Sequence, residues 1–111
     1  MDNYQILKYA KRIPHFKGVF MRNELRNPRK NESLIINLDS APGPGTHWVA
    51  VKKRANRILY FDPFGMPPPK EVIKYYKPLT VYYSTRKVQK LNAINCGEIC
   101  LKFLRTSKKF L

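Results

Sequence analysis

Residues 47–62 read HWVAVKKRANRILYFD and carry the clearest structural pattern in the chain. Two apolar runs flank the polar segment KRAN, which is typical of a β-hairpin with a four-residue loop. Closing this loop pairs Lys52 with Arg57 and sets His47 opposite Asp62. Both faces of each strand are apolar, so we expect two central strands that are covered on both sides.

Further elements are predicted on either side of this hairpin. Periodicity and boundary residues indicate a helix over 3–13, a loop with a short extended or irregular segment over 15–27, a strand over 33–38, a helix over 70–77, a strand over 79–84 and a helix from Cys96. A chain of 111 residues is long enough for one domain with a small core. We therefore expect one α+β domain over 1–111, with a small central mixed or antiparallel sheet packed by helices.

The segment 89–104 carries a candidate nucleophile. Cys96 begins the last predicted helix, after Asn95, a good N-cap, and Glu98 is placed to complete a capping box. Unpaired N–H groups and the helix dipole at this end favour a thiolate. A small residue is also ordinary at a helix start, so the other residues have to decide between the two readings.

Cysteine catalysis needs a general base beside the thiol, a group that orients the base, and donors for the oxyanion. The hairpin supplies His47 as base and Asp62 as orienting acid, while Gln89 is an amide able to donate to the oxyanion. Trp48 follows His47 in the sequence, and we expect its side chain to form one wall of the substrate site. Taken singly, each of these residue types also has an ordinary structural role, such as Asp in a turn.

The remaining His and Cys residues are interpreted as structural. His15 follows Pro14 at a predicted helix end, and Cys100 falls on the packed side of the last helix. Cys96 and Cys100 are one turn apart, with Cβ atoms about 5–6 Å from each other. A disulfide needs about 3.5–4.5 Å, so we expect two reduced thiols, as in cytosolic or nuclear proteins. This spacing with remote histidines also lacks the paired ligands of a zinc site, so no metal is expected.

The charge of the chain is strongly positive. Lys and Arg number 22 against 7 Asp and Glu, a formal net charge of +15 spread along the whole sequence. Such a balance favours affinity for nucleic acid or another polyanion, with a merely solvated basic surface as the alternative. Lys52, Lys53 and Arg54 form the tract that we assign to DNA binding on this ground.

Membrane insertion and secretion are not expected. The N-terminal residues lack an apolar signal core, and no run reaches the about 18 apolar residues of a membrane-spanning helix. We expect a soluble protein with no membrane partner.

The sequence contains four separated motifs: Gly45-Thr-His47-Trp48-Val-Ala, Tyr60-Phe-Asp62-Pro63-Phe64-Gly65, Gln89 with Cys96-Gly97 seven residues later, and Cys100 with Phe103-Leu104. Together they resemble those of the adenovirus-type cysteine endopeptidases, the adenains, which belong to the same group as the SUMO and ubiquitin-like proteases. The resemblance runs from about Leu34 to Leu104 in the order His, acid, Gln, Cys. The segment Phe16–Arg22 also resembles proteases of Maverick/Polinton-type elements and related viruses.

The resemblance implies an adenain-like fold in which Cys96 is the nucleophile, His47 the base, Asp62 its orienting acid and Gln89 the oxyanion donor. It also implies cleavage of precursor polypeptides after small residues of the Gly or Ala type, in viral or transposon maturation. The expected location is the virion or the host nucleus or cytoplasm. Adenoviral members are activated by DNA, so DNA is a candidate activator and no other cofactor is implied. They also use a peptide linked to an upstream cysteine, which this chain lacks before Cys96.

Two other functions remain open at this stage. One is a non-catalytic, basic DNA-binding module derived from a protease. The other is a deconjugating protease for ubiquitin-like modifiers, since the same residues serve both reactions. The chain is also shorter than the adenoviral enzymes, so accessory helices and part of the substrate groove are expected to be missing. Whether it acts alone or as a dimer is not decided by the sequence.

Overall fold

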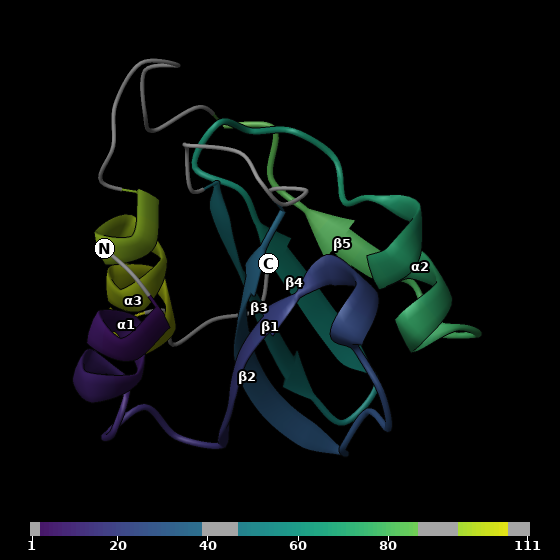
Figure 1. Ribbon diagram of the computed structural model, residues 1–111. Helices are drawn as coiled ribbons and strands as arrows, with labels where there is room; N and C mark the ends of the chain where they lie inside the picture. The colour runs from purple at the N-terminus through teal and green to yellow at the C-terminus, as the bar shows by residue number, and fades with distance from the viewer. Residues whose placement is uncertain (1–2, 39–46, 87–95, 107–111) are drawn as a thin grey trace.

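The computed structural model describes residues 3–38, 47–86 and 96–106. The elements are α1 (Asn3–Tyr9), β1 (Phe16–Met21), the 3-10 helix η1 (Arg22–Glu24), β2 (Asn31–Asn37), β3 (Trp48–Arg54), β4 (Arg57–Phe61), α2 (Lys70–Tyr76), β5 (Val81–Tyr83) and α3 (Cys96–Thr106). One sheet lies between helices on either face (Figure 1). The α+β class predicted from the sequence is therefore confirmed.

The sheet has five strands in the order β1-β2-β3-β4-β5. The two inner pairs, β2 with β3 and β3 with β4, are antiparallel, whereas the outer strands β1 and β5 run parallel to their neighbours. The central strand β3 is buried over Trp48–Lys53, and only Arg54 at its end is partly exposed. The prediction of central strands covered on both sides is confirmed for β3 and for the middle of β4.

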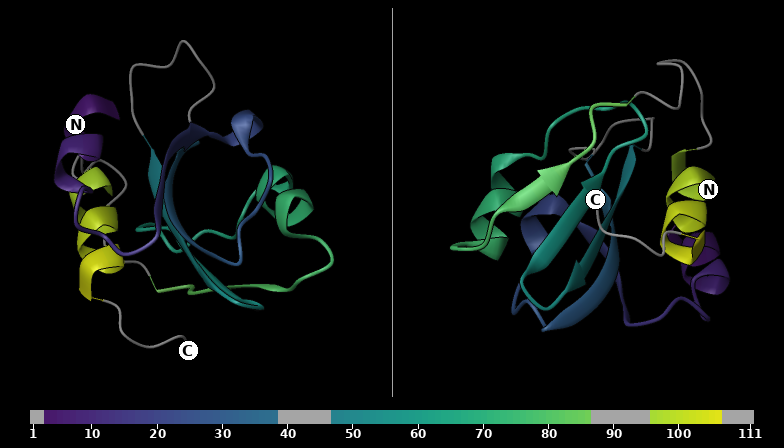
Figure 2. Two further views of the ribbon diagram at one scale, coloured as in Figure 1. Left: turned by 90° about the horizontal axis from the view of Figure 1, so that it is seen from below. Right: turned by 180° about the vertical axis from the view of Figure 1, so that it is seen from behind.

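Each face of the sheet packs against its own layer, as two further views show (Figure 2). On one face, α1 and α3 cover alternate residues of the central strands, including Ile35, Trp48 and Ala50. On the other face, α2 covers the intervening residues, with Val72 and Tyr76 packed against Val49 and Tyr60 among others. This alternation follows from the two-residue period of a strand, which sends neighbouring side chains to opposite faces.

The register of the central hairpin differs from the predicted one. Arg54, rather than Lys52, lies opposite Arg57, so the loop has two residues instead of four. The strand extends further because β3 also pairs with β2 as far as Arg54, opposite Asn31, and the Ala55 N–H donates to Asn31 Oδ1 at 3.1 Å. A shift of two residues leaves every side chain on its predicted face, so the burial pattern survives the wrong pairing.

Three other predictions are corrected at their boundaries. Residues 15–27 were expected to be a loop followed by a short extended or irregular segment; the structure forms the six-residue strand β1 and the turn η1 there. The side chains of β1 are all half-buried, without the alternation of buried and exposed residues that marks a strand with one covered face. The first helix ends at Tyr9 instead of residue 13, and β5 is confined to Val81–Tyr83 within the predicted 79–84.

A buried carboxylate ties α2 to the sheet. Glu32 on β2 is fully buried and accepts hydrogen bonds from the hydroxyls of Tyr75 and Tyr76, at 2.9 and 2.8 Å. The ammonium group of Lys17 lies 3.6 Å from the same carboxylate, and the Arg29 N–H donates to it at 2.8 Å. A buried charge is costly unless it is paired and hydrogen-bonded, and here both conditions are met.

Stability is expected to fall at alkaline pH. Burial raises the pKa of Tyr60, Tyr75 and Tyr76 above the usual 10.0, and Glu32 contributes for the last two. The folded protein therefore keeps protons that the unfolded chain loses above about pH 10. The unfolding free energy should be intact below that pH and fall by about 1.4 kcal/mol per pH unit for each tyrosine above it. Urea denaturation between about pH 8 and about pH 11 measures this slope.

The matched control is Tyr60→Phe. The Tyr60 hydroxyl is buried and has no hydrogen-bond partner among the residues that the structure describes. Its removal should leave stability at neutral pH unchanged or slightly higher, while the alkaline slope decreases by one tyrosine. An unchanged slope in this variant would contradict the assignment.

Candidate active site

His47 and Asp62 form the centre of the candidate site. His47 immediately precedes β3 and Asp62 immediately follows β4, at the same end of the sheet. The imidazole Nε2 lies 3.1 Å from both carboxylate oxygens of Asp62. The Asp62 side chain is 1% exposed, whereas that of His47 is 23% exposed. The predicted contact between the two residues is therefore present.

This contact arises by a different route from the one predicted. Extending the observed register beyond Ala50 and Phe61 puts His47 opposite Phe64, and their rings do lie 4.7 Å apart. Asp62 reaches the imidazole because the chain turns immediately after β4. The Phe64 N–H donates to Asp62 Oδ1 at 2.8 Å, and the Gly65 N–H donates to the Asp62 carbonyl at 2.8 Å. The turn thus holds the carboxylate beneath the imidazole.

The hydrogen bond to Asp62 defines which imidazole nitrogen is left for chemistry. A carboxylate only accepts hydrogen bonds, so Nε2 carries the hydrogen that it donates. In the neutral ring, Nδ1 then holds the lone pair and is the atom that can accept a proton. Phe64 packs on the ring and limits its rotation. This arrangement leaves Nδ1 as the imidazole nitrogen that is able to accept a proton.

Helix α3 is anchored to both strands of the hairpin. The buried Cys100 donates its S–H to the carbonyl of Trp48, the residue after His47, at 3.2 Å. Phe103 stacks on Phe61 with ring centroids 4.5 Å apart. Cys100 is a core thiol, as predicted. These two contacts align the helix with the strand ends that carry His47 and Asp62.

The start of α3 lies at the His47 end of the sheet. Its first residue is Cys96, one helical turn before Cys100. Figure 1 shows this end of the helix beside the beginning of β3, with the end of β4 at the same edge. The side chain of Cys96 lies outside the described part of the structure. The structure therefore supports its predicted role as the nucleophile through the position of the Cys96 backbone only.

The loop after β4 packs tightly against the segment that follows β5. Gly65 has a φ of +72°, and a Cβ at this position would lie 2.5 Å from the Thr85 carbonyl oxygen. Only glycine allows this close approach with this backbone conformation. Gln89 follows within the next few residues of the chain but lies outside the described residues, so its predicted oxyanion role stays a prediction.

Trp48 does not line an open site. Its side chain is 1% exposed and belongs to the core layer beneath α1 and α3. The residue after His47 points to the α3 face because strand side chains alternate. The predicted substrate wall is thus a core residue, and the aromatic group beside the base is Phe64 instead.

The residues of the predicted DNA-binding tract are largely buried or bonded to other groups of the chain. Lys52 and Lys53 are 8% and 6% exposed, and burial followed by the Arg54 charge lowers the pKa of Lys52. The Arg54 guanidinium donates hydrogen bonds to the Glu32 carbonyl at 3.3 Å and to Ser33 Oγ at 3.2 Å. Burial also lowers the pKa of Arg54. Lys53 and Arg54 thus bond to oxygen atoms of the fold, and Lys52 is buried, so the tract offers little free positive charge to a phosphate.

Two features bear on other kinds of site. Within 3–38, 47–86 and 96–106, no group of three or more His, Cys, Asp or Glu side chains is arranged to hold a metal ion. In the same ranges, every helix is too short or too polar to cross a bilayer.

Two contacts at the site were not anticipated from the sequence. Phe64 belongs to one of the motifs singled out in the sequence, but no feature of the neighbouring sequence indicated that its ring would pack on His47. The bond from Cys100 to Trp48 also depends on segments 52 residues apart. Only the apolar periodicity of the last helix indicated that Cys100 faces the sheet.

The fold is similar to that of a viral protease. No protein-family model matches the sequence, and a search of curated proteins finds no match. A crystal structure of ASFV pS273R protease aligns with a TM-score of 0.63 and 21% identity, over 96% of this chain and 56% of that one. A selenomethionine structure of ASFV pS273R protease aligns with a TM-score of 0.53 and 27% identity, over 73% of this chain and 35% of the other. The chain thus spans about half the length of the protease in the first alignment.

Gly65→Ala is expected to lower the unfolding free energy by about 2 kcal/mol or more. A positive φ costs an L-residue about 1–2 kcal/mol, and the new methyl group would overlap the Thr85 carbonyl oxygen. Chemical denaturation of both proteins measures the difference.

The matched control is Ala55→Gly. Ala55 has a φ of +55° in the hairpin turn, so the same backbone strain is relieved in this variant. It should be neutral or more stable by up to about 1 kcal/mol. A loss at Ala55 as large as that at Gly65 would contradict the steric argument.

Proposed function

We propose that this chain is a cysteine endopeptidase with Cys96 as nucleophile, His47 as general base and Asp62 as the residue that orients the base. The carrying observation is the 3.1 Å contact between His47 Nε2 and Asp62, at the sheet end where α3 begins with Cys96. The likeness to the fold of a viral protease over nearly the whole chain supports the same proposal.

The first half of the reaction forms an acyl-enzyme. His47 Nδ1 takes the proton of the Cys96 thiol, and the thiolate attacks the carbonyl carbon of the scissile peptide. The Cys96 N–H, at the start of α3, and the Gln89 amide stabilise the oxyanion. The carbon–nitrogen bond then breaks, and the protonated imidazole transfers its proton to the leaving amine.

The second half releases the acid product. With the amine gone, neutral His47 takes a proton from a water molecule, and the resulting hydroxide attacks the thioester carbonyl. The carbon–sulfur bond breaks and the thiolate departs, recovering the proton through the imidazole. Throughout this cycle the Asp62 carboxylate accepts the hydrogen bond from Nε2, which keeps Nε2 as the donor nitrogen. Its negative charge also stabilises the imidazolium when it forms.

The substrates we propose are precursor polypeptides cut after small residues of the Gly or Ala type, in viral or transposon maturation. This finer assignment rests on the motifs around His47, Asp62, Gln89 and Cys96. The proposed location is the virion or the host nucleus or cytoplasm, with DNA as a candidate activator. The relationship to the adenains and to the proteases of Maverick/Polinton-type elements is part of the same proposal.

Cys96→Ser and His47→Ala should each reduce hydrolysis of a fluorogenic peptide library with Gly and Ala at the cleaved position by at least about 10²-fold. Iodoacetamide should label the wild-type chain once, at Cys96, near neutral pH, and label Cys96→Ser not at all. Intact-mass spectrometry reads the label. Unchanged hydrolysis in either variant would refute the mechanism.

Cys100→Ser is the matched control. A serine hydroxyl can still donate to the Trp48 carbonyl, and Cys100 is fully buried, so single labelling at Cys96 should persist. A folded wild-type chain that neither cleaves peptides nor labels rapidly would favour the non-catalytic alternative. Reaction with a ubiquitin-like probe but with no peptide would favour the deconjugating protease.

Asp62→Asn tests the orienting carboxylate separately. Asparagine keeps one acceptor oxygen but replaces the other with an NH2 donor and removes the negative charge, so the tautomer that leaves Nδ1 free and the imidazolium are both expected to be held less strongly. Peptide hydrolysis should fall by about 10²- to 10⁴-fold, with a folded protein by circular dichroism. A rate equal to the wild-type rate would remove Asp62 from the mechanism.

A further inference from the structure

A concave site lies on the α2 side of the sheet, away from the layer that contains α3. The cavity measures about 360 Å³, within the size range of ligand pockets. Its lining comes from the segment 22–28 and from α2, and consists of Arg22, Asn23, Leu25, Arg26, Asn27, Pro28, Glu71, Lys74 and Tyr75. We call this cavity the η1–α2 groove.

The η1–α2 groove has an excess of positive charge. Its lining has three cations and one carboxylate, that of Glu71, which is already paired with Arg22 at 3.5 Å. Arg26 and Lys74 are exposed, and neither forms an ion pair within the described ranges. The neighbouring Glu24 carboxylate accepts a hydrogen bond from the Met21 N–H at 2.7 Å and forms no ion pair with either cation. Two cations are thus left to a ligand.

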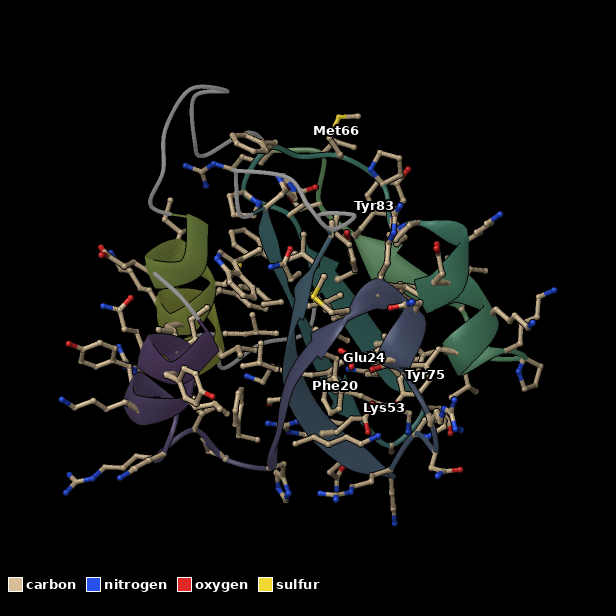
Figure 3. The ribbon with its side chains drawn as sticks, in the orientation of Figure 1. Phe20, Glu24, Lys53, Met66, Tyr75 and Tyr83 are labelled. Carbon is tan, nitrogen blue, oxygen red and sulfur yellow. The ribbon has the colours of Figure 1, made fainter. Side chains whose placement is uncertain are left out.

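The walls of the groove are held together by Lys17. Its ammonium group donates to the Arg26 and Asn27 carbonyls, at 2.7 and 3.0 Å, and to the Tyr75 hydroxyl at 2.7 Å. Tyr75 in turn donates to the buried Glu32 at 2.9 Å. In Figure 3, the labelled Tyr75 of α2 and Glu24 of η1 lie on the same side of the sheet. Because both walls are bonded to one ammonium group, the groove is formed before any ligand arrives, which lowers the cost of binding.

We infer that the η1–α2 groove binds an acidic segment of a polypeptide. Carboxylates of the partner would pair with Arg26 and Lys74, and an apolar side chain between them would contact Leu25, Pro28 and Tyr75. A concave site of this size that offers apolar contacts beside its cations suits a peptide better than a duplex, whose phosphates are contacted by cations on open surfaces. This inference does not depend on the proposed protease activity.

Fluorescence polarisation with the peptide fluorescein-Glu-Asp-Leu-Asp-Glu tests the inference. The double variant Arg26→Glu/Lys74→Glu should bind it at least about tenfold more weakly than the wild-type chain, a loss of about 1.4 kcal/mol. The control Lys8→Glu/Arg57→Glu makes the same change in net charge at exposed residues outside the groove lining, and should stay within about twofold of wild type. Circular dichroism verifies that both variants are folded.

A charge-swapped peptide, fluorescein-Lys-Arg-Leu-Arg-Lys, should bind Arg26→Glu/Lys74→Glu more tightly than it binds the wild-type chain. Equal losses in the groove variant and the control would overturn the inference, because the attraction would then be that of the net charge alone. No loss in the groove variant would also overturn it. A DNA duplex whose binding is weakened tenfold by the groove variant alone, while peptide binding is unchanged, would assign the groove to nucleic acid instead.

Discussion

Burial of β3 on both faces is the constraint on which the rest of the structure depends. Six successive residues, Trp48–Lys53, are removed from water, and their side chains alternate between the two layers. Fully burying one Val, Leu or Ile side chain contributes about 1.5–3 kcal/mol. Both helical layers are therefore needed to cover the sheet, and α3 has to lie against Trp48 and Ala50. The position of Cys96 follows from this packing.

Two kinds of interaction determine where α3 lies on the sheet, apolar burial and directional contacts. Apolar burial presses the helix onto the sheet but is non-directional, so it would allow the helix to slide along the strand. The bond from Cys100 to the Trp48 carbonyl and the stacking of Phe103 on Phe61 are directional and set the position along β3. A hydrogen bond of this kind contributes only about 1 kcal/mol. Its value lies in alignment with His47 more than in stability.

The positive charge of the chain is divided between interior and surface. The run Lys52–Arg54 looked like a phosphate-binding tract, yet its cations bind backbone carbonyls or lie buried along the hairpin. Arg26 and Lys74, which are far apart in sequence, instead meet at one groove. A formal net charge of +15 therefore does not indicate where an acidic partner binds. That depends on which cations the fold leaves without carboxylates.

Periodicity and turn residues were enough to predict the α+β class, the last two helices, the central strands and the proximity of His47 to Asp62. That proximity was predicted from a register wrong by two residues, and it survives because the turn after β4 brings Asp62 back to the imidazole. The roles of the Cys96 thiol and Gln89 stay predictions from sequence.

The tertiary structure alone decided the parallel strand β1, the hairpin register, the burial of Trp48 and the contact of Phe64 with His47. Local sequence encodes which face of an element is apolar, whereas each of these features depends on a partner distant along the chain.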